Sequence, residues 1–268
     1  MNKISNNCSV EDSLKTPLLY NEAPIGGNYL GNNILELRTK GFTILRNVFE
    51  RDSVDAYREA VEEELLENDE GRDYLPEEAD LALAPILAPR LREILPHAVS
   101  KPPIIVHATL DSYIQSISKA RKHKPAKTHD PHKGWHKDGR HYIEGPVEPY
   151  FNMVSVTTYL RDLDEDEDGP TQVVVGSHLC NDNPFHGDGR VQAIRMKKQD
   201  LLIWIQKVWH RPLPRLKEGN RYFFLYRFVP PVIDNEILTE LPPPIKRLWD
   251  ATDDPALKFY LGGLYQEK

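Results

Sequence analysis

The sequence predicts a mainly β fold with flanking helices, whose core is a double-stranded β-helix, the jelly-roll arrangement also found in cupins. Beyond residue 103 the chain consists mostly of short segments rich in β-branched and aromatic residues: IIVHATL, DSYIQSIS, MVSVTTYL, TQVVV, AIRM, DLLIWI and RYFFLYRFV. Gly, Pro, Asp and Asn fill the connections, as in DEDEDGP and NDNPFHGDG. No long helical stretch separates the segments, as a parallel α/β sheet would require, so a barrel or jelly roll is favoured.

The residues ahead of this β-rich region predict the flanking helices. Residues 41–48, GFTILRNV, predict a strand. An amphipathic helix follows from Ser53, because apolar residues such as Val54 and Tyr57 recur three to four positions apart. A second helical stretch over residues 81–95 is interrupted by prolines.

We expect one domain over residues 1–268, since all-β domains often reach this size. Residues 1–33 are rich in Asn, Ser and Gly and lack sustained periodicity, so they predict a weakly ordered arm. Residues 232–268 predict a C-terminal extension that is first proline-rich and then helical near residues 245–249.

Composition and charge narrow the classes of function. Hydrophobic residues make up 40% of the chain, which is enough for a sizeable core. The formal net charge of -7 opposes binding to nucleic acid or to an anionic membrane, because both need a basic excess. Cys8 and Cys180 lie far apart and predict neither a disulfide framework nor a thiolate zinc site. With no secretory signal and no membrane-spanning apolar run, we expect a cytoplasmic protein whose partner is a small molecule; its oligomeric state stays open.

The segment GWHKDGR predicts part of a metal site. On an extended strand His136 and Asp138 point to the same face, because side chains alternate. His210 ends an apolar strand, DLLIWIQKVWH, and supplies a third ligand. Two histidines and one carboxylate leave three coordination positions open, as non-haem iron(II) needs to bind a chelating acid and O2. In a chain with ten histidines an H-x-D pair alone is weak evidence, so further residues must support it.

Arg221 provides that support. It stands eleven positions after His210, on the segment NRYFFLYRF, which can return antiparallel into the same barrel. A guanidinium stays charged and binds a carboxylate with two hydrogen bonds, so it suits the distal end of a dicarboxylate whose other end chelates the metal. These features predict a co-substrate that is a dicarboxylate.

Taken in order, these motifs resemble those of the phytanoyl-CoA dioxygenase (PhyH) family of iron(II)- and 2-oxoglutarate-dependent oxygenases. The similarity runs from about residue 35 to residue 231, which is the family-like core. It includes the opening GFTILRNVFERDSVDAYREAVEEEL, the metal strand WHKDG, the stretch YLRDLDEDEDGPTQVVVGSH, and DLLIWIQKVWH followed by NRYFFLYRFVP.

The resemblance implies roles for individual residues. It implies that iron is bound by His136, Asp138 and His210, that Arg221 binds the co-substrate, and that Gln115 and Thr157 line its pocket. The relatives that halogenate carry a small residue in place of Asp138, so the carboxylate here implies hydroxylation, desaturation or ring closure at an unactivated C–H bond. Pro212 stands where many relatives carry a small hydroxyl residue, which leaves open what else holds the co-substrate beside Arg221.

Less specific signals concern the substrate, which we expect to be a small, polar metabolite or natural-product intermediate. Arg140, His141 and Tyr142 follow Asp138 closely enough to reach it. The basic run over residues 119–133 is either a solvated loop or a lid that attracts an anionic substrate. Two other functions stay open: a cupin-like metalloenzyme that does not use 2-oxoglutarate, and a non-catalytic module that binds an anionic partner.

Overall fold

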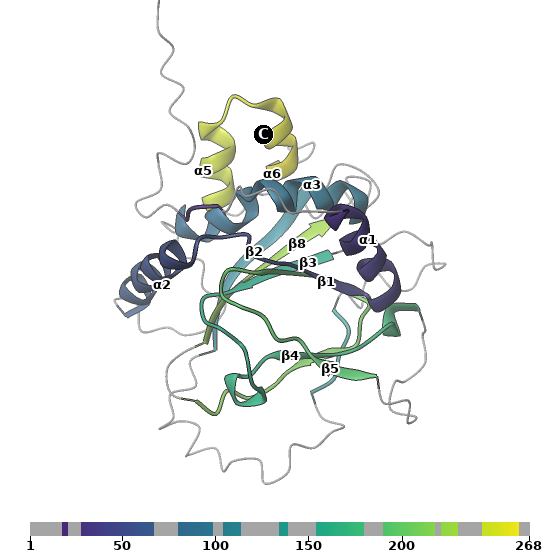
Figure 1. The fold of residues 1–268 in the computed structure, drawn as a ribbon. Helices are drawn as coiled ribbons and strands as arrows, with labels where there is room; N and C mark the ends of the chain where they lie inside the picture. The colour runs from purple at the N-terminus through teal and green to yellow at the C-terminus, as the bar shows by residue number, and fades with distance from the viewer. Residues whose placement is uncertain are drawn as a thin grey trace, which may run out of the picture.

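A computed structural model describes residues 18–20, 28–66, 80–98, 104–113, 134–138, 154–179, 190–217, 221–229 and 243–262 (Figure 1). The α-helices are α1 (Tyr29–Lys40), α2 (Arg51–Leu66), α3 (Pro89–Ala98), α5 (Pro243–Ala251) and α6 (Pro255–Gly262). The strands are β1 (Phe42–Leu45), β2 (Ile104–Tyr113), β3 (Val154–Tyr159), β4 (Thr171–Val174), β5 (Val191–Ala193), β6 (Leu201–Ile205), β7 (His210–Pro212) and β8 (Arg221–Val229). Short 3₁₀ helices are η2 (Asp80–Leu87), η4 (Asp166–Asp168) and η5 (Ser177–Leu179). None of these helices is long and apolar enough to cross a membrane.

Two antiparallel sheets and a helical layer make up the fold. The larger sheet has five strands in the order β1-β6-β3-β8-β2, and the smaller has three in the order β5-β4-β7. In Figure 1 the helices lie over one face of the larger sheet, while β4 and β5 lie beyond its other face. The larger sheet therefore has a helix face and an inner face, and the inner face is turned toward the smaller sheet.

Alternation along β8 assigns side chains to these two faces. Tyr222, Phe224, Tyr226 and Phe228 are fully buried on the helix face. Aromatic contacts join them to the helices: the ring of Phe224 lies 5.8 Å from that of Tyr57, and the ring of Phe228 lies 5.4 Å from that of Tyr260. The hydrophobic core thus lies mainly between the larger sheet and the helices.

The first helix was not predicted from the sequence. Helix α1 starts at Tyr29, inside the stretch expected to be a weakly ordered arm. Asn28 caps it, because its side-chain oxygen accepts from the backbone N–H of Gly31 at 3.1 Å. Leu37 is its one buried residue, and the partly buried Leu30 and Ile34 also pack against the core, so tertiary contacts stabilise a helix that lacks a strong apolar stripe.

Other elements follow the prediction with different bounds. The segments IIVHATL and DSYIQSIS were expected as two strands, but residues 104–113 form the single strand β2, which pairs with β8 along its length. The interrupted stretch over residues 81–95 is divided into η2 and α3. Proline cannot donate a backbone hydrogen bond, which explains the break between them. The helices α5 and α6 lie in the predicted C-terminal extension.

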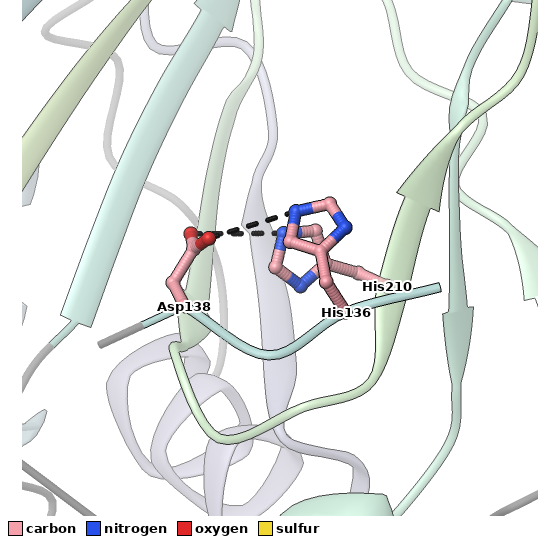
Figure 2. Close-up of side chains that lie close together, drawn as sticks. All are labelled: His136, Asp138 and His210. Atoms are coloured by element: carbon pink, nitrogen blue, oxygen red, sulfur yellow. Dashed lines mark ion pairs between the residues drawn. The ribbon is translucent and has the colours of Figure 1, made fainter. Parts of the chain in front are cut away.

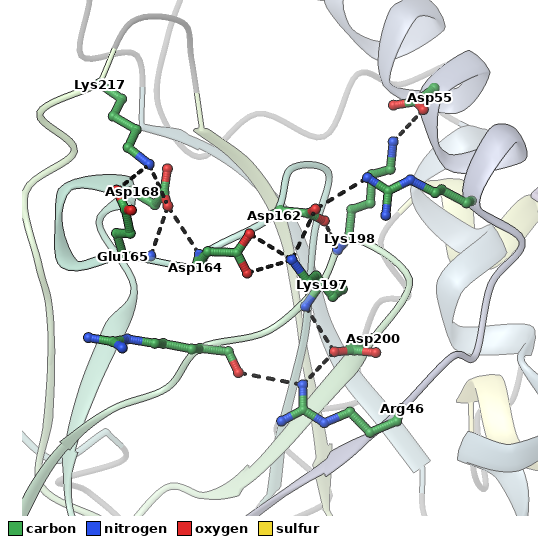
Figure 3. A network of polar contacts seen from close by, with 12 residues as sticks. Arg46, Asp55, Asp162, Asp164, Glu165, Asp168, Lys197, Lys198, Asp200 and Lys217 are labelled. Atoms are coloured by element: carbon green, nitrogen blue, oxygen red, sulfur yellow. Dashed lines mark hydrogen bonds and ion pairs between the residues drawn. The ribbon is translucent and has the colours of Figure 1, made fainter.

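A network of ion pairs fixes the loop before β4 to the start of β6 (Figure 3). Lys197 contacts Asp164 at 2.6 Å and Asp162 at 3.5 Å. The buried carboxylate of Asp200 accepts from Arg46 at 2.7 Å and from the backbone N–H of Lys197 at 2.9 Å. The acidic run that precedes β4 is therefore partly neutralised by lysines from the strand connection beside it.

Gly41 and His178 pack closely together near β7. Gly41 has a φ of +86°, and a Cβ at this position would collide with Val208 and His178. The ring of His178 is buried, and a 3.0 Å hydrogen bond between its Nε2 and the carbonyl of Arg38 holds it in position. This packing anchors the end of α1 against the turn that leads into His210.

Candidate metal centre

Three side chains from two separate segments converge at the edge of the smaller sheet. His136 and Asp138 lie in residues 134–138, and His210 begins β7. Nε2 of His136 lies 3.6 Å from Oδ1 of Asp138, and Nε2 of His210 lies 3.6 Å from its Oδ2. Figure 2 shows the carboxylate facing both imidazole rings. The three ligand atoms lie within 4.8 Å of one another, so these side chains form one group that could hold a metal ion.

Hydrogen bonds at the far side of each ring favour metal binding. Nδ1 of His136 lies 3.0 Å from the carbonyl of Gly134, and Nδ1 of His210 lies 3.0 Å from the carbonyl of Val208. A carbonyl only accepts, so each Nδ1 carries the proton and each Nε2 keeps its lone pair. This is the second shell that orients histidine ligands in metal sites.

The two histidines differ in exposure. The side chain of His210 is 8% exposed and that of His136 is 44% exposed. Burial lowers the pKa of His210, and although the carboxylate of Asp138 opposes this, the net shift is downward. His210 is therefore neutral near pH 7, as a ligand must be.

Backbone pairing fixes the geometry of the ligands. His136 and His210 exchange two backbone hydrogen bonds of 3.0 Å, so the metal segment extends the smaller sheet beside β7. Residues next to the ligands in the chain point to the opposite side, as alternation requires. There the guanidinium of Arg211 lies 4.6 Å from the centre of the Trp135 ring, and the ammonium of Lys137 lies 5.5 Å from that of Trp209. These cation–π contacts hold the two segments together from outside.

Arg221 is buried between the two sheets. It is 2% exposed, and its Nη1 donates to the carbonyl of Leu213, which follows β7, at 3.4 Å. The rings of Tyr159 and Phe223 each lie 5.7 Å from the guanidinium carbon. A Cβ on Gly169 would meet Nη1 at 2.9 Å, so the glycine leaves room for this side chain. The arginine is thus held on the inner face rather than turned to solvent.

Several buried polar atoms of the inner face have no hydrogen-bond partner among the residues that the structure describes. They include Oγ1 of Thr157, Nε1 of Trp204, Oε1 of Gln206 and Nε of Arg227. Thr157 is only 1% exposed, and the ring of Trp204 lies 6.0 Å from that of His210 in an edge-on contact. Leaving such an atom unpaired costs about 1–3 kcal/mol. The inner face therefore offers hydrogen-bonding groups to a ligand.

The structure brings together the predicted ligands and buries Arg221 and Thr157 on the inner face. Gln115, Arg140, His141 and Tyr142 lie outside the described residues, as does the basic run of residues 119–133. Sequence reasoning missed Arg227 and Gln206 as groups of the site. The signal for Arg227 was present, because it follows Arg221 by an even number of residues on a strand and so shares its face.

Comparisons with known proteins bear on the fold and the family. The solved structure of HygX from Streptomyces hygroscopicus with nickel and 2-oxoglutarate bound is 19% identical, with a TM-score of 0.57; 74% of this chain and 86% of that chain are covered. AviO1 from Streptomyces viridochromogenes is 18% identical, with a TM-score of 0.53; the match covers 75% of this chain and 95% of AviO1. SnoN, a non-haem α-ketoglutarate-dependent epimerase from nogalamycin biosynthesis, is 14% identical, with a TM-score of 0.54. The match covers 75% of this chain and 80% of SnoN. At these identities the likeness shows the fold, and it confirms the predicted jelly roll.

A comparison with curated protein sequences finds no match. The sequence profile of the phytanoyl-CoA dioxygenase (PhyH) family, in contrast, matches residues 37–216, which is more than half of the chain. The match contains the metal segment and β7, and it ends just before Arg221. The chain therefore belongs to the phytanoyl-CoA dioxygenase family, and the predicted class of enzyme, a non-haem oxygenase that uses iron(II) and 2-oxoglutarate, is confirmed.

Proposed function

We propose that this protein oxidises an unactivated C–H bond of a small, polar molecule, with iron(II) bound by His136, Asp138 and His210. One observation carries the proposal: two imidazole Nε2 atoms and a carboxylate meet within 4.8 Å, with both Nδ1 atoms directed to carbonyls. This donor set suits iron(II) that must keep three positions open. A bound iron ion would supply the activation of O2 together with 2-oxoglutarate.

The roles of the other residues follow from their placement. Arg221 would take the distal carboxylate of 2-oxoglutarate, because it is a buried guanidinium on the inner face. The Thr157 hydroxyl, which has no partner within the described part of the chain, would donate to the same molecule. The aromatic rings of Tyr159 and Phe223 hold the guanidinium in place and exclude water around it.

Asp138 limits the types of reaction that the site can catalyse. Its carboxylate faces both histidines and occupies the position at which a halide would otherwise bind, so hydroxylation, desaturation or ring closure is favoured over halogenation. The substrate class is supported by likeness alone: HygX has also been crystallised with nickel, 2-oxoglutarate and hygromycin B. For this chain we propose only that the substrate is small and polar. Further candidates to contact the co-substrate or the substrate are Gln115, Arg140, His141 and Tyr142.

The test is the binding of the co-substrate to the iron-loaded protein. Under anaerobic conditions, iron(II) and 2-oxoglutarate should produce the visible charge-transfer band of the chelate in the wild type. Arg221→Met should need at least about 100-fold more 2-oxoglutarate, because two charge-assisted hydrogen bonds are lost. Arg195→Met, at an exposed arginine, serves as the control.

Arg221→Lys covers the case in which the methionine variant does not fold, since it keeps a charge but cannot bind a carboxylate with two parallel hydrogen bonds. Release of succinate after admission of O2 gives a second readout. A wild type that binds iron but neither develops the band nor forms succinate would show that the site does not use 2-oxoglutarate.

A further inference from the structure

Arg227 is a cation of the inner face that the mechanism above leaves unused. It lies on β8 in register with Ser155 of β3, and Ser155 is in register with Trp204 of β6. Residues in register on antiparallel strands share a face, so Arg227, Ser155 and Trp204 form one row across the inner face. We refer to these three residues as the metal row, because the ring of Trp204 lies 6.0 Å from that of His210.

The metal row lies far from Arg221. Arg227 lies six positions after Arg221 on β8, which corresponds to about 20 Å between their backbones at 3.3 Å per residue. Thr157 and Tyr159 occupy the rows between them. A dicarboxylate that reaches from the metal to Arg221 therefore runs away from Arg227.

Donors of the metal row are unpaired. Nε of Arg227 and Nε1 of Trp204 are buried and lack a hydrogen-bond partner within the described ranges. No carboxylate of those ranges lies within ion-pairing distance of Arg227 either, whereas Arg46 and Arg215 each pair with an aspartate. Arg227 is partly buried and its Nε is fully buried, so the lack of a counter-ion is unfavourable, and an anionic ligand would offset that cost.

Gln206 lies beside the metal row and also has a buried polar atom without a partner in the described chain. Ser155 accepts from Nε2 of Gln206 at 2.9 Å, and Oε1 of Gln206 has no partner among the described residues. The backbone carbonyl of the same glutamine accepts from the N–H of Asp138 at 3.2 Å. One glutamine thus joins the metal segment to the metal row.

We infer that the metal row binds an anionic group of the substrate, such as a carboxylate, sulfate or phosphate, with Arg227 as the charged anchor and the Trp204 indole as a second donor. This inference rests on the proposed function and specifies the substrate class for the same site. The anion lies on the side of the metal away from Arg221, so substrate and co-substrate are held by arginines at opposite ends of β8. Oε1 of Gln206 is placed to accept from an O–H or N–H of the same molecule.

The test uses inorganic sulfate as the probe. Nickel replaces iron so that no turnover occurs, 2-oxoglutarate is kept saturating, and sulfate is titrated by calorimetry against potassium chloride of equal ionic strength. The wild type should bind sulfate saturably. Arg227→Gln should bind it at least about tenfold more weakly, since a charge-assisted hydrogen bond is lost, and Arg195→Gln should match the wild type.

Two results would overturn the inference. Equal sulfate binding by the wild type, Arg227→Gln and Arg195→Gln would identify an adventitious ion only. Displacement of 2-oxoglutarate by sulfate, or a weaker affinity for 2-oxoglutarate in Arg227→Gln, would assign Arg227 to the co-substrate instead. If Arg227→Gln does not fold, Arg227→Lys and Trp204→Phe replace it, each with an expected loss of several-fold. A wild type that does not bind 2-oxoglutarate at all would contradict the proposed function, which separates the two failures.

Discussion

The two faces of the five-stranded sheet share the same strands but differ in chemistry. On the helix face, Val154, Val156 and Phe224 are fully buried and packed into one apolar core. On the inner face, Thr157 and Arg227 present polar atoms that are buried without a partner in the described chain. Alternate residues of one backbone thus contribute to stability on one side and to recognition on the other.

Two neighbouring threonines show the difference most directly. Thr157 and Thr158 are both 1% exposed. Thr158 faces the helices, and its hydroxyl donates to the carbonyl of Asp200 at 3.5 Å. Thr157 faces inward, and its hydroxyl has no partner in the part of the chain that the structure describes. The comparison teaches that the inner face is arranged to bind a ligand, at some cost to the stability of the fold.

The largest effect should come from the helix face. Phe224→Ala should lower the free energy of unfolding by about 3–5 kcal/mol, because it removes a fully buried aromatic ring from the core. Leu225→Ala, at the next and only partly buried position, should cost less than half as much. Urea unfolding of both variants measures this. Equal losses would contradict the assignment of the two faces.

Removal of a metal ligand should affect binding more than stability. His210→Ala should weaken iron(II) affinity by more than about 100-fold, because loss of an outer partner alone typically costs 10–100-fold. Arg195→Ala is the control, since Arg195 is exposed and contacts Asp166 rather than a ligand. Competition with a chelator gives both affinities. Similar iron binding by His210→Ala and Arg195→Ala would exclude the proposed site.

The buried polar group His178 should affect stability in a pH-dependent way. Burial lowers its pKa, partly opposed by the hydrogen bond to the Arg38 carbonyl. Below about pH 6.5 the unfolded chain therefore binds a proton that the folded chain does not, so stability falls as the pH falls. Between pH 7.5 and 5.5, His178→Gln should lose less stability than the wild type, by up to about 1.4 kcal/mol. Urea unfolding at both pH values measures this, and an equal loss in both proteins would exclude a role for His178.

The smallest effect should distinguish the two threonines. Thr157→Val should leave stability unchanged or raise it by up to about 1 kcal/mol, because an unpaired buried hydroxyl is removed, while 2-oxoglutarate binds about 2–10-fold more weakly. Thr158→Val should lower stability by about 0.5–1 kcal/mol and leave 2-oxoglutarate affinity unchanged. Thermal unfolding and co-substrate titration test both. The reverse pattern would mean that the inner face is not the co-substrate pocket.

Much of the fold and the ligand set could be predicted from the sequence. The β-rich segments, the pair His136 and Asp138 on one face, and the approach of Arg221 all follow from the two-residue period of extended chain. Local patterns also predicted the helix after β1, although they missed α1, where the cap formed by Asn28 outweighs a weak apolar pattern.

Only the tertiary structure decided which side chains face one another across strands. The exchange of backbone hydrogen bonds between His136 and His210 joins segments far apart in the chain, and no local period encodes that partner. The same is true of Arg227, whose place beside Trp204 depends on the registers of three strands. Residue spacing determines the face on which a side chain lies, whereas long-range strand pairing determines what it meets there, because pairing is set by the packing of the whole chain.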